Sequence, residues 1–335
     1  MGNNILFAGD IGGTKSYLGL FETSEDGPKL ICQKRYKTQS FQNIVQLLQT
    51  FISENNLNPQ RIVIGVPGPV RQLPVKPVNL PWLIDPEKIK KKLGIPKISL
   101  LNDLEATSYG TQAFTEKDLY TIHEGTVDQQ GNVAVIAAGT GLGEGGLVWS
   151  VDRYTAIASE GGHSTFSPSC ELHYELGIYL KEKFGHVSWE RVISGPGLAS
   201  IYDFLRAREP HRESPWMQEA LIEEDDYSST IANAGLNQDC ELARDALNLF
   251  ADLYGCEAGN LALKLMSTGG LFLGGGIAPK LLSILQNGTF LQSFLDKGRM
   301  KQALESIPIH VVLNDAAALH GAAWWGNQLQ LNETN

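Results

Sequence analysis

The hydrophobic and polar positions of the chain follow two periods, one of strands and one of helices, and together these predict an α/β protein. Residues 5–21 form two apolar runs on either side of a Gly12-Gly13 turn, which is typical of a β-hairpin. Residues 29–36 predict a third strand, residues 41–54 an amphipathic helix and residues 61–66 a buried strand. Three strands, a helix and a fourth strand make a compact α/β unit.

The same two periods continue along the rest of the chain. They predict helices over 86–93, 104–110, 198–206, 216–223, 226–234, 240–266 and 315–325, and strands over 98–101, 132–138, 145–149, 271–273 and 309–313. The run of glycines after 271–273 is expected to turn into a helix. The last helix is rich in Ala and Gly, so it can pack closely on a sheet, and its position implies that the chain returns to its first domain.

One unit occurs twice. A strand, a turn of Gly and Thr and a returning strand are found at 5–21 and again at 132–149, about 130 residues later. This repetition predicts a duplicated architecture in which each half supplies one phosphate loop. Gly141, Gly143 and Gly146 also satisfy the dinucleotide pattern GxGxxG, but that pattern should open a helix and here it opens an apolar strand. The chain contains no GxxxxGK[ST] motif, and this excludes a P-loop nucleoside triphosphatase.

Composition narrows the class of protein. The 335 residues are enough for two domains, and 42% hydrophobic with 19% charged residues fits a soluble globular chain. A net charge of −10 without a basic block argues against nucleic-acid binding. It leaves phosphate ligands open, because backbone N–H groups and Mg²⁺ can bind them.

The spacing of the cysteines predicts neither a disulfide framework nor a zinc site. The four are widely spaced, so a disulfide scaffold or a four-ligand zinc site is not expected, and Cys170 with His173 is a weak metal signal. The sequence shows no secretory signal and no apolar run long enough to span a membrane. We therefore expect a cytoplasmic protein with reduced thiols.

Several turns carry candidate chemistry. Asp10 ends the first strand, where a carboxylate can hold Mg²⁺ directly or through water, and Gly12, Gly13 and Thr14 offer donors to an anion. An ordinary hairpin with a capped turn is the alternative. Gly274, Gly275, Gly276 and Ile277 follow a strand, and such glycines suit a flat ring or ribose pressed against the backbone.

Polar residues at strand ends are further candidates. Asn79 lies in a loop after a buried strand and could bind a ligand or cap the turn. Asn102 and Asp103 stand at a strand-to-helix junction, where one of them could be an N-cap, but two polar residues are more than a cap requires. Glu160 and His163 flank two glycines and could be a ligand site, a surface turn or a metal-ligand pair. Glu190 precedes a Gly-Pro-Gly turn and could be an ordinary helix carboxylate.

Taken together, six ordered motifs resemble those of bacterial glucokinases of the hexokinase-type group, which belong to the actin-like, ribonuclease-H-like superfamily of sugar kinases. They are Gly-Asp-Ile-Gly-Gly-Thr (9–14), Leu-Leu-Asn-Asp (100–103), Ala-Gly-Thr-Gly-Leu-Gly (138–143), Glu-Gly-Gly-His (160–163), Glu-Arg-Val-Ile-Ser-Gly-Pro-Gly-Leu (190–198) and Leu-Gly-Gly-Gly-Ile-Ala (273–278). The resemblance covers essentially the whole chain. Lys15 departs from it, since these glucokinases usually have Asn there. Cys170 stands alone where the related repressor-like kinases have a zinc-binding cysteine cluster.

The resemblance implies a fold and a reaction. It implies two actin-like domains with a cleft between them and mixed sheets flanked by helices: a small domain of residues 1–112 plus 313–335 and a large domain of residues 113–312. It implies transfer of phosphate from MgATP to the 6-hydroxyl of glucose, the first step of glycolysis, with closure of the domains over the sugar and a homodimer as assembly.

The resemblance also implies roles for single residues. Asp103 is the expected base, preferred over Asn102, which has no basic site, and over Glu160, which a strand end does not hold. The sugar ligands are expected to be Asn79, Asn102, Asp103, Glu160, His163 and Glu190. The expected ATP site comprises Gly9, Asp10, Ile11, Gly12, Gly13, Thr14, Gly139, Thr140, Gly141, Gly274, Gly275, Gly276 and Ile277, with Mg²⁺ held by Asp10 through water.

Two alternatives of different kinds stay open at this point. One is a sugar sensor that keeps the fold without turnover, against which the intact Asp103 argues. The other is a kinase for another hexose, such as mannose or fructose, or one that uses another phosphoryl donor such as polyphosphate.

Overall fold

The computed structural model describes residues 5–77, 80–224, 226–237 and 239–334. The chain divides into two compact units, which we call unit 1 (Met1–Asp118 with Asn314–Asn335) and unit 2 (Leu119–Leu313). None of the described helices is both long and apolar enough to cross a membrane.

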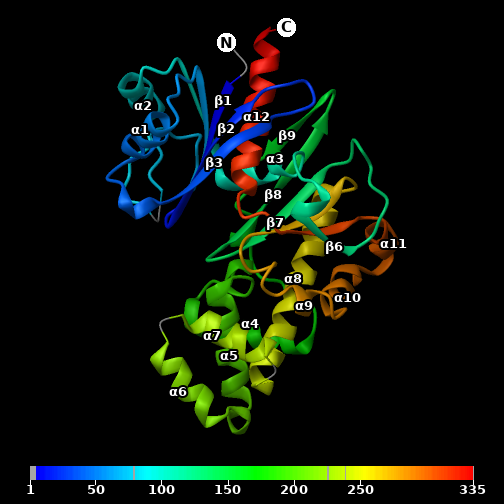
Figure 1. The fold of residues 1–335 in the computed structure, drawn as a ribbon. Coiled ribbons are helices and arrows are strands. Elements are labelled where there is room, and N and C mark those ends of the chain that lie inside the picture. Colours follow the sequence, from blue (N-terminus) through cyan, green and yellow to red (C-terminus); the bar gives the residue numbers. More distant parts are fainter. Residues whose placement is uncertain (1–4, 78–79, 225, 238, 335) are drawn as a thin grey trace. The chain divides into compact units, whose positions relative to one another are not determined.

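Unit 1 contains a five-stranded mixed sheet of order β3-β2-β1-β4-β5 (Figure 1). The predicted hairpin is confirmed: β1 (Ile5–Ile11) pairs antiparallel with β2 (Lys15–Glu22). The third strand, β3 (Lys29–Lys37), continues the antiparallel half of the sheet. The other half is parallel, with β4 (Arg61–Val66) beside β1 and β5 (Lys97–Asn102) beside β4. All six residues of β4 are buried, as expected of a central parallel strand.

Four helices complete unit 1, and local capping decides where they begin. They are α1 (Ile44–Glu54), α2 (Pro86–Leu93), α3 (Asp103–Gly110) and α12 (Ala317–Thr334). The first begins later than predicted because the Asn43 side chain accepts a hydrogen bond from Gln46 N and caps it. Phe51 of α1 stacks on Phe7 of β1 at 5.0 Å between ring centroids, which anchors the helix to the sheet.

The final helix, α12, lies beside β1 and α3 in unit 1 (Figure 1). It extends nine residues beyond the predicted end at 325. Its small residues allow close packing: a Cβ at Gly321 would lie 1.7 Å from the Ala106 carbonyl oxygen of α3. This contact holds α3, the helix that begins with Asp103, against the rest of the unit.

Unit 2 repeats the same strand order with one addition. Its sheet runs β6-β11-β10-β7-β8-β9, so β9-β8-β7-β10-β11 corresponds to β3-β2-β1-β4-β5. The strands are β6 (Leu119–His123), β7 (Val133–Ala138), β8 (Leu142–Ser150), β9 (Arg153–Ile157), β10 (Gly270–Gly274) and β11 (Ile309–Val312). The predicted duplication and the two mixed sheets are therefore confirmed. β6 and β9 were not predicted from the pattern.

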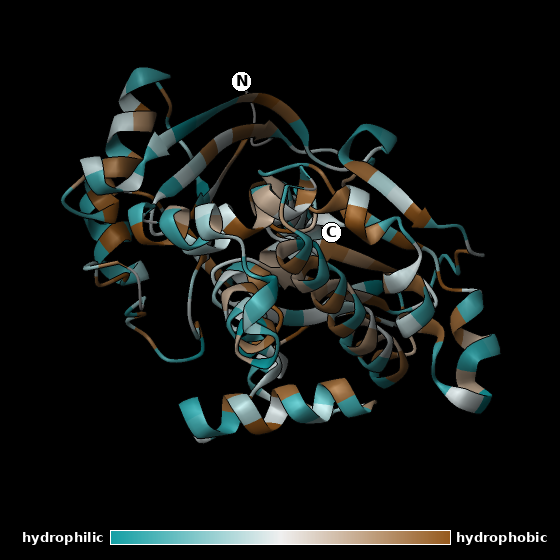
Figure 2. Ribbon diagram, turned by 90° about the horizontal axis from the view of Figure 1, so that it is seen from below, coloured by the Kyte–Doolittle hydropathy of each residue, from teal (hydrophilic) through white to brown (hydrophobic). Residues whose placement is uncertain are grey.

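The helices of unit 2 pack around α8. They are α4 (Glu171–Phe184), α5 (Gly195–Arg208), α6 (Pro215–Glu223), α7 (Tyr227–Leu236), α8 (Glu241–Leu265), α9 (Leu282–Leu285), α10 (Thr289–Leu295) and α11 (Lys301–Glu305). α8 is tied to the sheet by the buried Tyr254 hydroxyl, which donates to the Ile136 carbonyl of β7 at 3.1 Å. Figure 2 shows hydrophilic and hydrophobic residues sharing the outer helices, as amphipathic packing requires.

Two predictions near the glycine motifs were wrong. The Gly-Pro-Gly segment is not a separate turn, because it forms the start of α5. Ser194 caps this helix, which begins at Gly195, and Pro196 is tolerated in its first turn. The glycine run after β10 leads through turns, and only the four residues of α9 are helical there.

We expect Gly321→Ala to destabilise unit 1 by about 1–3 kcal/mol, because the added methyl group has no room against α3. Thermal unfolding would measure the loss, with Asn332→Ala at an exposed position of α12 as the control. Equal melting temperatures for the two variants would contradict the packing argument.

Candidate functional site

The first glycine turn is tight. Gly12 N donates to Lys15 O at 3.0 Å, and Thr14 O accepts from Thr38 N at 3.0 Å, so the turn is fixed to the end of β3. Thr14 and Lys15 are exposed at its tip. Because the Gly12 N–H is already bonded within the turn, an anion here would have to rely on the neighbouring donors of Gly13 and Thr14.

Asp10 lies at the end of β1, opposite Gly65 of β4. Burial, and to a lesser extent the negative charge of Asp103, raise the pKa of Asp10 to about 7. Two carboxyl groups in a partly buried region are the kind of donor set that a hard cation compensates. No group of three potential metal ligands occurs among the described residues.

Asn102 and Asp103 have different positions at the junction of β5 and α3: Asn102 is the N-cap of the helix, and Asp103 is its first residue. The Asn102 side chain accepts from Leu104 N at 2.9 Å and from Glu105 N at 3.4 Å, and Glu105 accepts from Asn102 N at 3.1 Å. This is a complete capping box. The Asn102 amide nitrogen donates to Gly68 O at 3.2 Å. The N-cap role is thus filled by Asn102.

Asp103 follows as the first residue of α3. It is half-buried, and one carboxylate oxygen lies 2.9 Å from its neighbour Leu104 N. The positive end of the helix dipole favours the carboxylate there. The rigid junction therefore presents a carboxylate in a fixed place. Asn79, the other polar candidate of unit 1, lies outside the described residues.

Three of the predicted sugar ligands come together in unit 2. His163 Nδ1 lies 3.8 Å from Glu190 Oε1, and His163 Nε2 lies 4.0 Å from Glu160 Oε2. Glu160 and His163 are exposed, whereas Glu190 is partly buried. Two carboxylates and an imidazole next to one another can accept and donate hydrogen bonds to several hydroxyl groups of one small ligand.

Two glycines bring this cluster onto the sheet. Gly161 and Gly162 lie in the 3₁₀ turn Gly161–His163, which packs on β8. A Cβ at Gly162 would lie 2.1 Å from the Leu142 carbonyl oxygen, and one at Gly161 would lie 2.4 Å from Glu144 Oε2. Only residues without a side chain allow this approach. The Gly-Gly pair of the motif therefore sets the position of Glu160 and His163.

Glu190 joins the cluster to the second glycine turn. Its Oε2 accepts from Leu142 N at 3.1 Å, directly after Gly139-Thr140-Gly141. The same oxygen fills the space where a side chain of Gly141 would be. The turn between β7 and β8 and the cluster of Glu160, His163 and Glu190 thus share one carboxylate.

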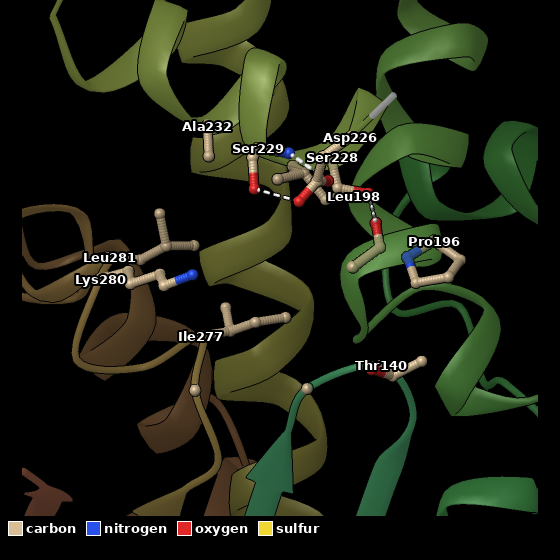
Figure 3. A pocket seen from close by; sticks show the side chains of 13 residues that line it. Thr140, Pro196, Leu198, Asp226, Ser228, Ser229, Ala232, Ile277, Lys280 and Leu281 are labelled. Carbon is tan, nitrogen blue, oxygen red and sulfur yellow. Dashed lines mark hydrogen bonds between the residues drawn. The ribbon is translucent and has the colours of Figure 1, made fainter. Parts of the chain in front are cut away.

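The same turn lines part of a pocket of about 540 Å³ (Figure 3). Its lining is contributed by four segments of unit 2: the β7–β8 turn, the start of α5, α7 with its cap, and the turn after β10. The residues are Gly139, Thr140, Gly195, Pro196, Leu198, Asp226, Ser228, Ser229, Ala232, Gly276, Ile277, Lys280 and Leu281. The volume and the mixed lining suit a small organic ligand with an apolar part and a charged part.

Backbone hydrogen bonds hold these segments together. Gly195 N donates to Gly139 O at 2.9 Å, and Ile277 N donates to Ala138 O at 3.2 Å. The Ser228 hydroxyl donates to Gly195 O at 2.7 Å, which ties α7 to α5. Gly275 has φ of +79° and lies so close that a Cβ would be 2.2 Å from Ala138 O. A glycine is required at this point of the motif.

The wall of the pocket carries both signs of charge. Hydrogen bonds from the Ser229 side chain and backbone, helped by the charge of Lys280, hold the pKa of Asp226 below its usual value although burial opposes them. Lys280 extends from the opposite side of the pocket (Figure 3). Such a wall can bind hydroxyl groups through Asp226 and an anion through Lys280.

The structure places the expected nucleotide residues unevenly. Gly139, Thr140, Gly276 and Ile277 line the pocket, whereas Gly274 is buried at the end of β10. Sequence reasoning missed the part that α7 contributes. Asp226 with Ser229 is visible in the sequence as a helix cap, but nothing in the pattern places that cap next to a turn some ninety residues earlier.

The weak metal signal has another explanation. The His173 imidazole is buried and lies 3.0 Å from the Ser169 hydroxyl and 2.9 Å from Asp252 Oδ2. Cys170 is exposed beside it. His173 is therefore a hydrogen-bonded structural residue that fixes α4 to α8.

The chain is similar to known proteins along almost its whole length. The family model described as Glucokinase matches residues 7–329. The glucokinase of Nostoc punctiforme is 42% identical, with 95% of this chain and 98% of that protein aligned. The glucokinase of a Synechocystis strain is 39% identical over 96% of this chain and 98% of its own length.

Solved structures share the fold. The crystal structure of glucokinase from an Antarctic psychrotroph superimposes with a TM-score of 0.86 at 29% identity, covering 97% of this chain and 99% of that one. A ROK family glucokinase from Streptomyces griseus shares the fold at 22% identity with a TM-score of 0.61, covering 95% and 98%. On the family model and the relatives together, this chain belongs to the glucokinase family.

Proposed function

We propose that this chain transfers the γ-phosphoryl group of ATP to the 6-hydroxyl of glucose, giving glucose 6-phosphate and ADP. Its membership of the glucokinase family supports the reaction. The observation that carries the assignment of residues is the double contact of Glu190, which lies beside His163 with one oxygen and accepts from the β7–β8 turn with the other. The hydroxyl-binding cluster and the phosphate turn are thereby linked through a single side chain.

Glu160, His163 and Glu190 are proposed to hold the sugar. Their polar atoms match the alternating donors and acceptors of neighbouring hydroxyl groups. Such a site discriminates against a sugar that lacks a hydroxyl, because its own polar groups are then left without a partner. Asn102 is proposed to donate its second amide N–H to a sugar hydroxyl, since its Oδ1 caps α3 and its first amide N–H bonds Gly68 O.

Asp103 is proposed to accept the proton of the 6-hydroxyl as that oxygen attacks the γ-phosphorus. The bond from the γ-phosphorus to the β–γ bridging oxygen breaks, and ADP leaves. A carboxylate at a capped helix start is held in one orientation, which favours proton transfer along a fixed line.

The pocket beside Thr140 is proposed to take the nucleoside of ATP. Ile277, Leu281 and Ala232 supply apolar surface for the base, and Asp226 and Ser228 supply hydrogen-bonding groups for the ribose. The phosphates then run toward Thr140 and its neighbouring glycines. Lys280, which lies beside Ile277 and Leu281 in the pocket, can attract an anion.

Asp10 is proposed to hold Mg²⁺, in part through water, with Asp103 as the nearby second carboxylate. Bound Mg²⁺ neutralises charge on the transferring phosphates. We further propose a cytoplasmic homodimer, whose assembly is expected from the family resemblance. Light scattering on the purified protein measures the assembly.

We expect Asp103→Asn to lower kcat by about 10²–10⁴-fold, because the amide cannot accept the proton. The cap of α3 should persist, since Asn102 supplies it. Coupled ADP release measures turnover, and calorimetry with glucose should give nearly unchanged affinity. A variant with normal kcat would remove Asp103 as the base.

We expect Glu160→Gln to weaken glucose binding roughly tenfold, because a charged acceptor becomes a neutral amide. Asp152→Asn, which changes an exposed carboxylate on the hairpin between β8 and β9, is the matched control. Calorimetry on both variants measures the affinity. If Glu160→Gln binds glucose as well as the control does, Glu160 is not a sugar ligand.

We expect Ala232→Phe to raise the KM for ATP by on the order of tenfold, since the ring would enter the pocket and displace the base. Affinity for glucose in the absence of nucleotide should stay the same. Steady-state kinetics with varied ATP provides the measurement, and an unchanged KM would place the nucleoside elsewhere.

Activity with a panel of hexoses and donors separates the remaining alternatives. ADP formation with glucose that is lost in Asp103→Asn supports the proposed reaction. Turnover only with another hexose or with polyphosphate would assign a different substrate, and saturable glucose binding without ADP would assign a sensor.

A further inference from the structure

Glu144 is a buried carboxyl group outside the residues discussed so far as ligands. It is the third residue of β8, and only 2% of the residue is exposed. Within the described part of the chain its Oε1 has no hydrogen-bond partner. Burying a carboxyl oxygen without a hydrogen-bond partner costs folding free energy. Such a group in a native protein therefore calls for an explanation, which can be functional.

The carboxyl of Glu144 supports the turn that carries two of the proposed sugar ligands. A Cβ at Gly161 would lie 2.4 Å from Glu144 Oε2 and 3.0 Å from Glu144 Cβ. Gly161 therefore rests directly on this side chain. Because Glu160 precedes Gly161 and His163 follows two residues later, the position of both depends on the surface that Glu144 provides.

We propose that Glu144 is a positioning residue for sugar binding: its buried side chain sets the height of the turn Gly161–His163 above β8 and thereby the placement of Glu160 and His163. This inference rests on the proposed function of those two residues. It assigns Glu144 no contact with substrate.

The surroundings of Glu144 favour its neutral form. Burial raises the pKa of Glu144 to about 7, and the charge of the fully buried Glu257 of α8 adds to the rise. Lys264 lowers it to a smaller degree, but its Nζ lies 3.0 Å from Glu257 Oε1. Asn260 also bonds Glu257, at 2.8 Å.

The other charged and titratable groups facing this region do not alter that balance. Tyr254 of α8 donates its hydroxyl to the Ile136 carbonyl, and Lys297 acts on Glu257. Glu160 and His163 on the turn above Glu144 are exposed to solvent. Proton loss from Glu144 would therefore place a second negative charge beside Glu257 and under the turn.

This predicts a dependence on pH with a defined sign. The folded protein binds the proton of Glu144 more tightly than the unfolded chain, whose carboxyl has a pKa of 4.5. The stabilisation from that proton is complete below 4.5 and is lost as the pH rises through about 7. The turn should loosen as Glu144 itself loses its proton, around pH 7.

The test compares the full-length protein with Glu144→Gln and Glu144→Ala, and uses Asp152→Asn as an exposed control. Hydrogen exchange of residues 158–164 without ligand reports the turn itself. Glu144→Ala should speed that exchange and raise the KM for glucose by about tenfold or more, while the KM for ATP stays within about twofold.

Glu144→Gln keeps the shape without the titration. Between pH 6 and 8.5 the wild-type KM for glucose should rise, whereas that of Glu144→Gln should rise less. Both proteins retain His163, so the difference between their profiles isolates Glu144. This comparison holds even if Glu144→Ala does not fold.

Matching exchange rates in wild type and Glu144→Ala, or identical pH profiles in wild type and Glu144→Gln, would overturn the inference. Failure of the proposed function has a different signature. The wild type would then not phosphorylate glucose, while exchange at the turn would still respond to Glu144→Ala.

Discussion

The turn between β7 and β8 is the constraint on which the candidate site of unit 2 depends. Its backbone and that of the adjoining strand ends bond three separate segments: Gly195 N donates to Gly139 O, Ile277 N donates to Ala138 O, and Leu142 N donates to Glu190. Each bond satisfies a polar group that the sheet leaves open at its edge. The pocket beside Thr140 and the cluster of Glu160, His163 and Glu190 therefore both depend on this hydrogen-bonded turn.

Duplication explains why each unit carries a glycine turn at the same place. In both sheets the first strand of the hairpin is central, with an antiparallel neighbour on one side and parallel strands on the other. The parallel strands end at the same edge as that turn, so residues that follow them collect there. Asp10 and Asp103 use this edge in unit 1, and the turn after β10 uses it in unit 2.

Buried acids are treated in two ways in this fold. Burial raises the pKa of the fully buried Glu257, but Asn260 and Lys264 donate hydrogen bonds to its carboxylate and oppose that rise. Glu144 lacks such donors for Oε1 and is favoured in its neutral form. Asp10 shares the raised pKa, and there a bound cation would supply the missing positive charge.

The sequence by itself determined many of the helices and strands, the duplicated hairpins and the motifs, because strand and helix periods and glycine turns are local properties. It also indicated Asp103 and the residues Glu160, His163 and Glu190, although their roles came from a resemblance. The tertiary structure decided that the Asn102 side chain caps α3 and that α5 begins at Gly195. It also decided that α7 and Lys280 line the pocket. It also revealed that Glu144 lies against the turn Gly161–His163. These facts depend on contacts between residues far apart in the chain, and a one-dimensional pattern of polarity carries no information about which distant segments touch.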